Sequence, residues 1–300
     1  MKIHLIILIG LVSAAAAAET NTPFKLSFPR WGPSLRGGSV YNFDTAMDKG
    51  GSFSVNRYFL EAGVARMWAL DRMLAFSAGF GQDDYRFSGT TAQPWNNIDN
   101  YRASLFARWG FNDKWVLFAG PSVRSYGESG VDLDDALTLA LFGGVSYQFG
   151  DRLTLGPGIG IFEQIEEGVR YVPIILVNWR ITENLSLETG GGLAATAGPG
   201  LSLVYAFSDK WKAGLTGRYE KKRFRLNGDN PVSPNGVGED RNTPIVANLS
   251  YFFYPAGYVS GIIGYNFAGN LAIEDKNGTG LFDTDYEPSP QVGLVASFRF

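Results

Sequence analysis

The last ten residues of the chain, QVGLVASFRF, constrain its fold more than any other stretch. Apolar side chains recur there at every second position, namely Val292, Leu294, Ala296, Phe298 and Phe300. Polar residues or glycine occupy most of the positions between them, and Val295 is the one apolar exception. A period of two places the apolar side chains on one face of an extended strand. The segment is therefore predicted to be a β-strand with one apolar face.

The same alternation recurs at greater length inside the chain, for example over residues 101–111, 137–149 and 211–219. These segments approach the ~9 to 11 residues that a strand needs to cross a bilayer. A secreted β-sandwich is the alternative, but its strands are mostly ~5 to 6 residues long. An apolar face repeated around a whole sheet needs lipid to cover it. The pattern favours an all-β, transmembrane, antiparallel up-and-down β-barrel.

Composition agrees with a barrel that crosses the membrane with strands. The chain has 38 glycines, 14% aromatic residues and only 18% charged residues, below the usual share of about a quarter. Its hydrophobic fraction of 45% is ordinary, and the longest apolar run after the N-terminus, residues 136–145, is too short for a spanning helix of ~20 residues. A barrel has ordinary hydropathy because each strand shows only every second residue to lipid.

The N-terminus is predicted to be an export signal. Residues 1–18 contain Lys2, an apolar stretch over residues 3–12 and a run of small residues ending at Ala18, which together indicate a cleaved secretory signal peptide. Residues 19–38 alternate poorly and contain three prolines, so they are predicted to form a periplasmic tail. The barrel is then expected over residues 39–300, in the outer membrane of a Gram-negative cell.

Short polar turns punctuate the alternating segments. Six are predicted, at residues 69–72, 111–115, 149–153, 181–185, 207–211 and 254–257. Asp, Asn and Gly suit such hairpins because they tolerate positive φ or hydrogen-bond their own backbone. Longer polar connections are predicted at residues 88–99, 125–135, 227–241 and 270–289. Tight turns on one rim and longer loops on the other are typical of outer-membrane barrels.

These turns predict the strand number. Six hairpins give twelve strands. A first strand near residues 40–47 and the closing strand bring the total to about fourteen. Twelve is the alternative if two weakly alternating segments are not strands. Aromatic residues beside the tight turns are expected to form a girdle at the membrane interface. They are Trp68, Phe111, Trp115, Phe149, Phe207, Trp211 and Tyr254.

The signal peptide, the alternating strands, the turns and the terminal SFRF together resemble Gram-negative outer-membrane β-barrel proteins of the porin-like kind. In that class the ending with Phe298 and Phe300 serves as a signal to the barrel-assembly machinery, so the resemblance implies this machinery, outer-membrane lipid and lipopolysaccharide as partners. Residues 178–226 are similar to barrels catalogued only as a domain of unknown function. The resemblance implies fold and location, but neither a substrate nor an oligomeric state.

Residue usage argues against an enzyme and against nucleic-acid binding. The chain has no cysteine, and its only histidine, His4, lies in the predicted signal peptide. Membrane-barrel hydrolases and acyl transferases generally rely on a histidine, so the protein is predicted not to be an enzyme and to need no cofactor. A net charge of −3 gives no electrostatic footprint for nucleic acid.

The polar faces of the strands suggest a channel. With the apolar face outward, the charged residues expected to line the lumen are Glu61, Arg102, Arg108, Arg124, Arg180, Glu188, Lys212, Arg218, Glu220 and Arg299. An excess of bases favours a porin-like passive channel for small hydrophilic solutes with a weak anion preference. The alternative is a closed structural or surface-interaction barrel, whose charges pair with one another. Inward phenylalanines that could constrict the lumen are Phe106, Phe118, Phe142 and Phe162.

Two further motifs could bind ligands. The basic run Lys221, Lys222, Arg223 and Arg225 could contact lipopolysaccharide phosphates, or it could be an ordinary solvated rim. In residues 274–287, EDKNGTGLFDTDYE, a partial match to a calcium loop places possible ligands at Asp275, Asn277, Thr279 and Asp283. The match is imperfect because Tyr286 stands where a bidentate Glu is required, so an ordinary acidic loop is the alternative.

Overall fold

Tight turns join most neighbouring strands, so the chain builds its sheet largely in sequence order. The structure is a computed structural model that describes residues 30–90, 92–189, 200–253 and 257–300. Its strands are β1 (Arg30–Ala46), β2 (Ser52–Ala69), β3 (Arg72–Ser88), β4 (Ile98–Gly110), β5 (Trp115–Glu128), β6 (Leu137–Phe149), β7 (Leu153–Gln164), β8 (Gly168–Arg180), β9 (Leu185–Thr189), β10 (Gly200–Ala206), β11 (Trp211–Arg218), β12 (Glu220–Arg225), β13 (Val237–Phe253), β14 (Gly257–Glu274), β15 (Gly280–Tyr286) and β16 (Ser289–Arg299).

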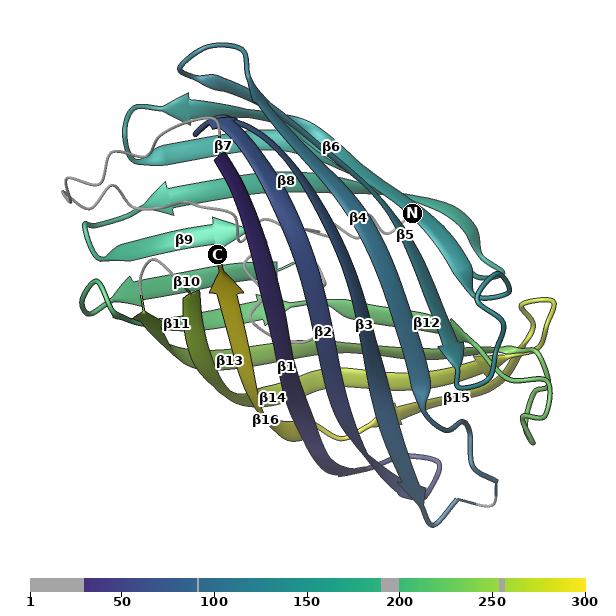
Figure 1. The fold of residues 1–300 in the computed structure, drawn as a ribbon. Coiled ribbons are helices and arrows are strands. Elements are labelled where there is room, and N and C mark those ends of the chain that lie inside the picture. Colours follow the sequence, from purple (N-terminus) through teal and green to yellow (C-terminus); the bar gives the residue numbers. More distant parts are fainter. Residues whose placement is uncertain (1–29, 91, 190–199, 254–256) are drawn as a thin grey trace.

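The sheet closes on itself into an antiparallel barrel (Figure 1). Consecutive strands pair from β1 to β11, then β11 pairs with β13, β13 with β14 and β14 with β16, and β16 returns to β1. This ring has fourteen strands, which confirms the predicted number. The two remaining strands, β12 and β15, pair with the ends of β13 and β14 that lie farthest from the tight turns.

The first strand begins earlier than the sequence predicts. Residues 30–38 belong to β1, which pairs with both β2 and β16, so their assignment to a periplasmic tail is wrong. Pro33 lies opposite Val64, and its carbonyl accepts the Phe300 amide at 3.0 Å. Glycines hide the alternation here, and at Gly38 a Cβ would approach the Leu294 carbonyl to 2.7 Å. Residues 1–29, which include the predicted signal peptide, lie outside the described residues.

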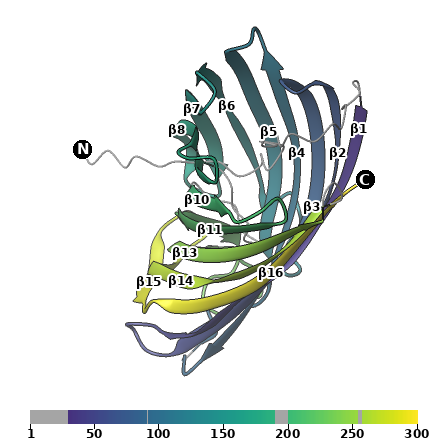
Figure 2. The ribbon, with the colours of Figure 1, turned by 90° about the vertical axis from the view of Figure 1, so that its left-hand side faces the viewer.

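The predicted hairpins lie together at one end of the barrel, which we call the tight-turn rim. Five of them fall between consecutive strands of the ring, and the sixth joins β13 to β14 through residues 254–256, which lie outside the described residues. The opposite end is the loop rim. Two predicted loops there are shorter than expected, because β13 already begins at Val237 and β15 forms a hairpin on the end of β14. Figure 2 shows the wall curving from β1 to β16 around a common interior.

Apolar side chains cover the outside of the wall. Leu60 on β2, Leu141 on β6 and Leu294 on β16 are among many large hydrophobic residues exposed there. The predicted girdle residues are exposed as well, except Tyr254, which lies outside the described residues. In the part of the chain that the structure describes, no helical segment has the length and apolar character that a membrane crossing requires.

The register between β1 and β16, which closes the barrel, can be tested with an engineered disulfide. Ser39 and Leu294 face each other across the β1–β16 seam, where opposite Cβ atoms lie about 4.5 to 5.5 Å apart. Because the chain has no cysteine of its own, a Ser39→Cys, Leu294→Cys variant should form one intramolecular disulfide on mild oxidation. A mobility shift of the boiled, non-reduced protein on a gel detects it. The control pair is Ser39→Cys with Val292→Cys, two residues out of register; equal linking of both pairs would contradict the seam.

Candidate functional site

The predicted lumen charges lie on the inward faces of their strands. Along each strand they alternate with exposed apolar side chains, as Arg102 does with Tyr101 and Lys212 with Trp211. Arg180 and Arg299 are the two at the tight-turn rim, and both are exposed there. The rest are at least partly buried inside the barrel. The interior is therefore charged and polar in the region where the sequence places it.

Four of the ten predicted lumen charges neutralise one another in two ion pairs. Arg102 forms an ion pair with Glu61 at 2.5 Å, and Arg218 forms one with Glu220. Lys212 instead lies over the Phe252 ring, with its ammonium 4.9 Å from the ring centroid. Arg180 and Glu188 form no ion pair with each other among the described residues, and Glu188 accepts a hydrogen bond from Ser186 at 2.8 Å. Pairing of this kind weakens the field that an anion would meet in the lumen.

The basic run does not form a solvated rim, because β12, which continues β11 along β13 in the same register, is largely buried at the mouth of the barrel. Beyond Arg218 the chain keeps β13 as a partner, and at its end Arg225 pairs with Gly127 of β5 on the other side of the mouth. Lys222 and Arg223 are buried, and Lys221 and Arg225 retain only 14% and 15% side-chain exposure. All four cations have carboxylate partners, so lipopolysaccharide phosphates would have to compete with these ion pairs, and binding of lipopolysaccharide stays a prediction.

One face of β12 is tied to β3 and β2. The Lys222 ammonium lies 2.5 Å from the Asp83 carboxylate, which also lies 3.4 Å from Arg57. Arg57 in turn forms an ion pair with Asp240 at 2.7 Å, and Asp240 accepts hydrogen bonds from the hydroxyls of Tyr85 and Tyr286. These groups are nearly inaccessible to water, and two cations balance two carboxylates. A buried ionic cluster of this kind depends on every member being paired.

The other face of β12 is tied to the β7–β8 hairpin and to β13 and β14. The Arg223 guanidinium lies 2.7 Å from both Glu239 and Glu274, and it donates to the Ile165 carbonyl. Lys221 pairs with Glu167 at 3.1 Å. Burial works to raise the pKa of Glu167, but the charges of Lys221 and Arg223 outweigh it, so the pKa lies below its ordinary value.

The three glutamates of this region could be mistaken for a metal site. Carboxylate oxygens of Glu167, Glu239 and Glu274 lie within 4.8 Å of one another. Lys221 and Arg223 already contact all three residues between them, and the Arg223 bonds are charge-assisted. The cluster is best described as an ion-pair network that holds β12.

An apolar cluster fills the mouth behind β12. Trp95, from the connection between β3 and β4, is fully buried, and its ring meets Phe224 of β12 edge-on at 5.0 Å and Tyr85 at 5.6 Å. We call this group the mouth cluster; it comprises Met47, Phe53, Val55, Tyr85, Trp95, Ile98, Phe224, Leu226, Leu271, Ile273 and Tyr286. The Glu128 carboxylate accepts hydrogen bonds from the backbone amides of Asn96 and Asn227 at 2.8 and 2.9 Å. These bonds hold the surrounding loops in place. The loop end of the barrel is therefore filled.

Three of the four predicted constriction residues meet inside the barrel. Phe106 stacks on Phe142 at 6.1 Å, and Phe118 lies 6.4 Å from Phe142. Gly120 makes room for them, because a Cβ there would lie 2.2 Å from the Phe142 ring. Phe162 points inward on β7 but is not part of this cluster. The phenylalanines narrow the lumen on one side, along β4 to β6.

The predicted calcium loop is a hairpin turn. The Asp275 carboxylate accepts the amides of Asn277 and Thr279, each at 2.8 Å, and these bonds lower the pKa of Asp275. Asp283 does not join them: it lies on β15 opposite Ala272, and it accepts a hydrogen bond from Asn270. The four residues therefore do not converge on one point, and calcium binding at this loop stays a prediction.

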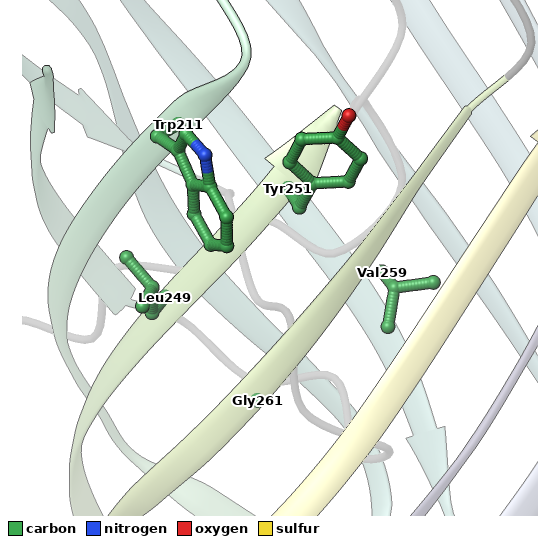
Figure 3. Close-up of a pocket in the computed structure, with 5 residues that line it drawn as sticks. All are labelled: Trp211, Leu249, Tyr251, Val259 and Gly261. Carbon is green, nitrogen blue, oxygen red and sulfur yellow. The ribbon is translucent and has the colours of Figure 1, made fainter. Parts of the chain in front are cut away.

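A shallow apolar groove of about 410 Å³ lies on the outside of the wall (Figure 3). It is lined by Trp211 on β11, Leu249 and Tyr251 on β13, and Val259 and Gly261 on β14. Trp211 and Leu249 are outward residues of the exposed apolar belt, so the groove belongs to that surface and not to the lumen. Its lining offers no charged group for catalysis or for an ionic ligand.

Comparison with known proteins adds no family. No family model matches the chain, and no curated protein matches it, so the similarity to a catalogued group of barrels stays a prediction. An outer-membrane channel from Pseudomonas putida F1 is similar over 94% of this chain and 100% of its own, at 11% identity and a TM-score of 0.48. A Pseudomonas aeruginosa FadL homologue gives 11% identity, 90% coverage of each chain and a TM-score of 0.49.

The translocator domain of the autotransporter NalP from Neisseria meningitidis is similar over 92% of this chain and 90% of its own, at 15% identity and a TM-score of 0.38. Likenesses at this level give no function to the chain. What it does must be argued from its own residues.

The Asp83 cluster predicts a large stability effect. An Asp83→Asn variant leaves Arg57 and Lys222 buried with Asp240 as their remaining carboxylate, which should lower the free energy of unfolding by about 3–5 kcal/mol. The neighbouring Asp84→Asn removes only a pair with Arg86, whose side chain is 77% exposed, and should cost about 0–1 kcal/mol. Urea titration followed by tryptophan fluorescence measures both. Equal effects would show that the Asp83 cluster does not hold β12.

Glu167 predicts a pH dependence. Because its pKa is lowered in the folded state, its contribution to stability is present above the pKa of the unfolded chain and is lost as pH falls through the folded pKa. Glu167 faces Lys221, Arg223 and Arg170. A Glu167→Gln variant should be less stable than the wild type by roughly 1 kcal/mol at neutral pH, and the difference should vanish in acid. Glu183→Gln, in an exposed tight turn, is the control; a difference that grew in acid would contradict the pairing.

Proposed function

We propose that the protein is a porin-like outer-membrane channel for small hydrophilic solutes, with its loop end closed by β12 in the conformation described here. The observation that carries the proposal is the buried β12, held on both faces by ion pairs. A closed ring with an apolar outer belt suits a lipid bilayer, and a charged lumen suits water-borne solutes. No part of this proposal needs an enzyme activity.

The bonds that hold β12 suit a gate better than a permanent plug. Apolar residues of similar volume often stabilise an interior as well as a buried ionic cluster does, or better. Once a strand is displaced, its charged side chains can be hydrated or can pair with mobile ions. Apolar side chains that become exposed gain no such partners. In the part of the chain that the structure describes, β12 has one continuous strand partner, β13, and touches β5 at a single register pair. Displacing it would exchange buried pairs for hydrated ones and would expose one apolar side chain, Phe224.

The lumen charges support a weak preference for anions. Arg102 and Arg218 are paired with glutamates, so they add little to the field along the lumen. Lys212 and Arg124 have no carboxylate partner in the part of the chain that the structure describes. A small surplus of cations attracts anions without excluding every cation.

A closed barrel with a structural or surface role is the second candidate. The mouth cluster favours it, because eleven buried apolar residues, Trp95 among them, fill the loop end. In either case the chain is proposed to reach a Gram-negative outer membrane through a cleaved signal peptide. Phe298 and Phe300, exposed on the closing strand, would then be presented to the assembly machinery.

Single-channel recording in planar bilayers tests the channel. The wild type should open rarely, and Lys222→Gln should raise the open fraction severalfold, because the variant removes the bond between β12 and Asp83. Lys210→Gln, in an exposed tight turn, should behave as the wild type. Silence of the wild type and of both variants would favour the closed barrel. A cation-selective reversal potential would overturn the anion preference.

A further inference from the structure

A row of charged side chains crosses the inner wall and ends beside the filled mouth. The strand register places Arg36 opposite Glu61, Glu61 opposite Gly79, Gly79 opposite Arg102, and Arg102 opposite Arg124. The row therefore follows one line of register from β1 to β5, across strands that tilt relative to the barrel axis. Tyr126, the next inward residue of β5 towards the mouth, packs against the mouth cluster. The β5 end of the row therefore lies next to the closed end.

The two arginines at the end of this row are an unfavourable pair. Arg102 and Arg124 are directly opposed on neighbouring strands, and like charges in such positions destabilise a sheet. Glu61 compensates Arg102 through a 2.5 Å ion pair. Nothing compensates Arg124 among the described residues: its guanidinium lies 5.9 Å from the Tyr126 ring, and its buried Nε has no hydrogen-bond partner. A buried donor without a partner costs stability.

The wall below the arginine pair changes from polar to aromatic. Ser104 faces Ser122 across the strands, and the Ser77 and Ser104 hydroxyls lie 2.9 Å apart. Beyond them lie Phe106, Phe118 and Phe142, which are buried against one another. The arginines and serines keep partial exposure although they line the interior. They therefore line an open part of the lumen, which has the two arginines at one end and the phenylalanine cluster at the other.

We propose that Arg124, supported by Arg102, binds the carboxylate of a small aromatic acid in the lumen. A guanidinium presents paired N–H donors that match the two oxygens of a carboxylate. Since Glu61 forms an ion pair with Arg102, Arg124 is the member of the arginine pair that has no carboxylate among the described residues, which suits a monoanion. The body of the acid lies along the serines towards the phenylalanine cluster. The inference rests on the proposed channel only for the route by which the solute arrives.

A purely structural role for Arg124 makes the opposite prediction for stability. If Arg124 were kept to hold the wall together, Arg124→Met would lower the urea midpoint of unfolding. As a ligand-binding group directly opposite another arginine, Arg124 lowers the stability of the barrel when no ligand is bound. Its replacement should therefore raise the midpoint, while the ligand should raise the midpoint of the wild type only.

Calorimetry on the refolded protein in detergent tests the site with benzoate as the probe. The wild type should bind benzoate, and Arg124→Met should bind it at least about tenfold more weakly, as expected for the loss of a charged hydrogen-bonding partner. Arg86→Met, which removes an arginine whose side chain is 77% exposed, is the matched control and should bind as the wild type. Benzamide, which keeps the ring and loses the charge, and acetate, which keeps the charge and loses the ring, should both bind more weakly than benzoate.

Several outcomes would overturn the site: no benzoate binding by the wild type, equal weakening by both variants, equal affinity for benzamide, or a lower urea midpoint for Arg124→Met. Because binding in detergent needs no conduction, its result is separable from that of the bilayer recordings. A barrel that binds benzoate but never conducts would retain the site and lose the channel. A protein that conducts without binding benzoate would retain the channel proposal and overturn the binding site.

Discussion

Every backbone amide and carbonyl in the membrane-facing wall must be paired within the wall, because lipid offers them no partner. The fourteen-strand ring meets this condition by closing β16 onto β1 over nine register pairs. Closure then divides the side chains, since alternate residues of each strand must face either lipid or lumen. The apolar belt, the aromatic girdle and the charged interior all follow from that division.

The β12 strand departs from this rule, and its departure defines the mouth. Residues 220–225 continue β11 along β13 in the same register, and among the described residues their other edge has a strand partner only at Arg225, which pairs with Gly127 of β5. Side chains supply the remaining partners: carboxylates of β3, β13, β14 and the β7–β8 hairpin surround the four cations of this strand. The strand thus replaces backbone pairing with ion pairing, and ion pairs respond to pH and salt in a way that a sheet ladder does not.

Local sequence signals predicted the wall well. The turns, the closing strand and the exposed aromatics depend on residues close in the chain, such as the apolar residue, Asp, Lys and Trp around residues 111–115 and 207–211. The start of β1 was missed because glycines and Pro33 mask its alternation. The polar alternation did locate Arg102, Arg124 and Glu61, since each occupies an inward position set by the period of its strand.

The mouth could not be predicted in the same way. Residues 221–225 read as a basic rim because nothing nearby in the chain neutralises them; Lys222 finds its partner Asp83 139 positions away. Arg57 and Asp240, separated by 183 positions, were missed for the same reason. Long-range pairing of this kind depends on the barrel having closed. The calcium pattern groups Asp283 with Asp275 by spacing alone, whereas the chain turns back into β15 between them, which local spacing does not reveal.

The central claim, that β12 lies inside the mouth as a bonded strand, is tested most directly by hydrogen exchange and mass spectrometry of the refolded protein. Peptides covering residues 220–226 should exchange as slowly as those of β13. The Asp83→Asn variant should exchange faster in residues 220–226 while β1 and β16 stay protected. Exchange of this segment at the rate of an exposed loop in the wild type would show that β12 is not held in the mouth.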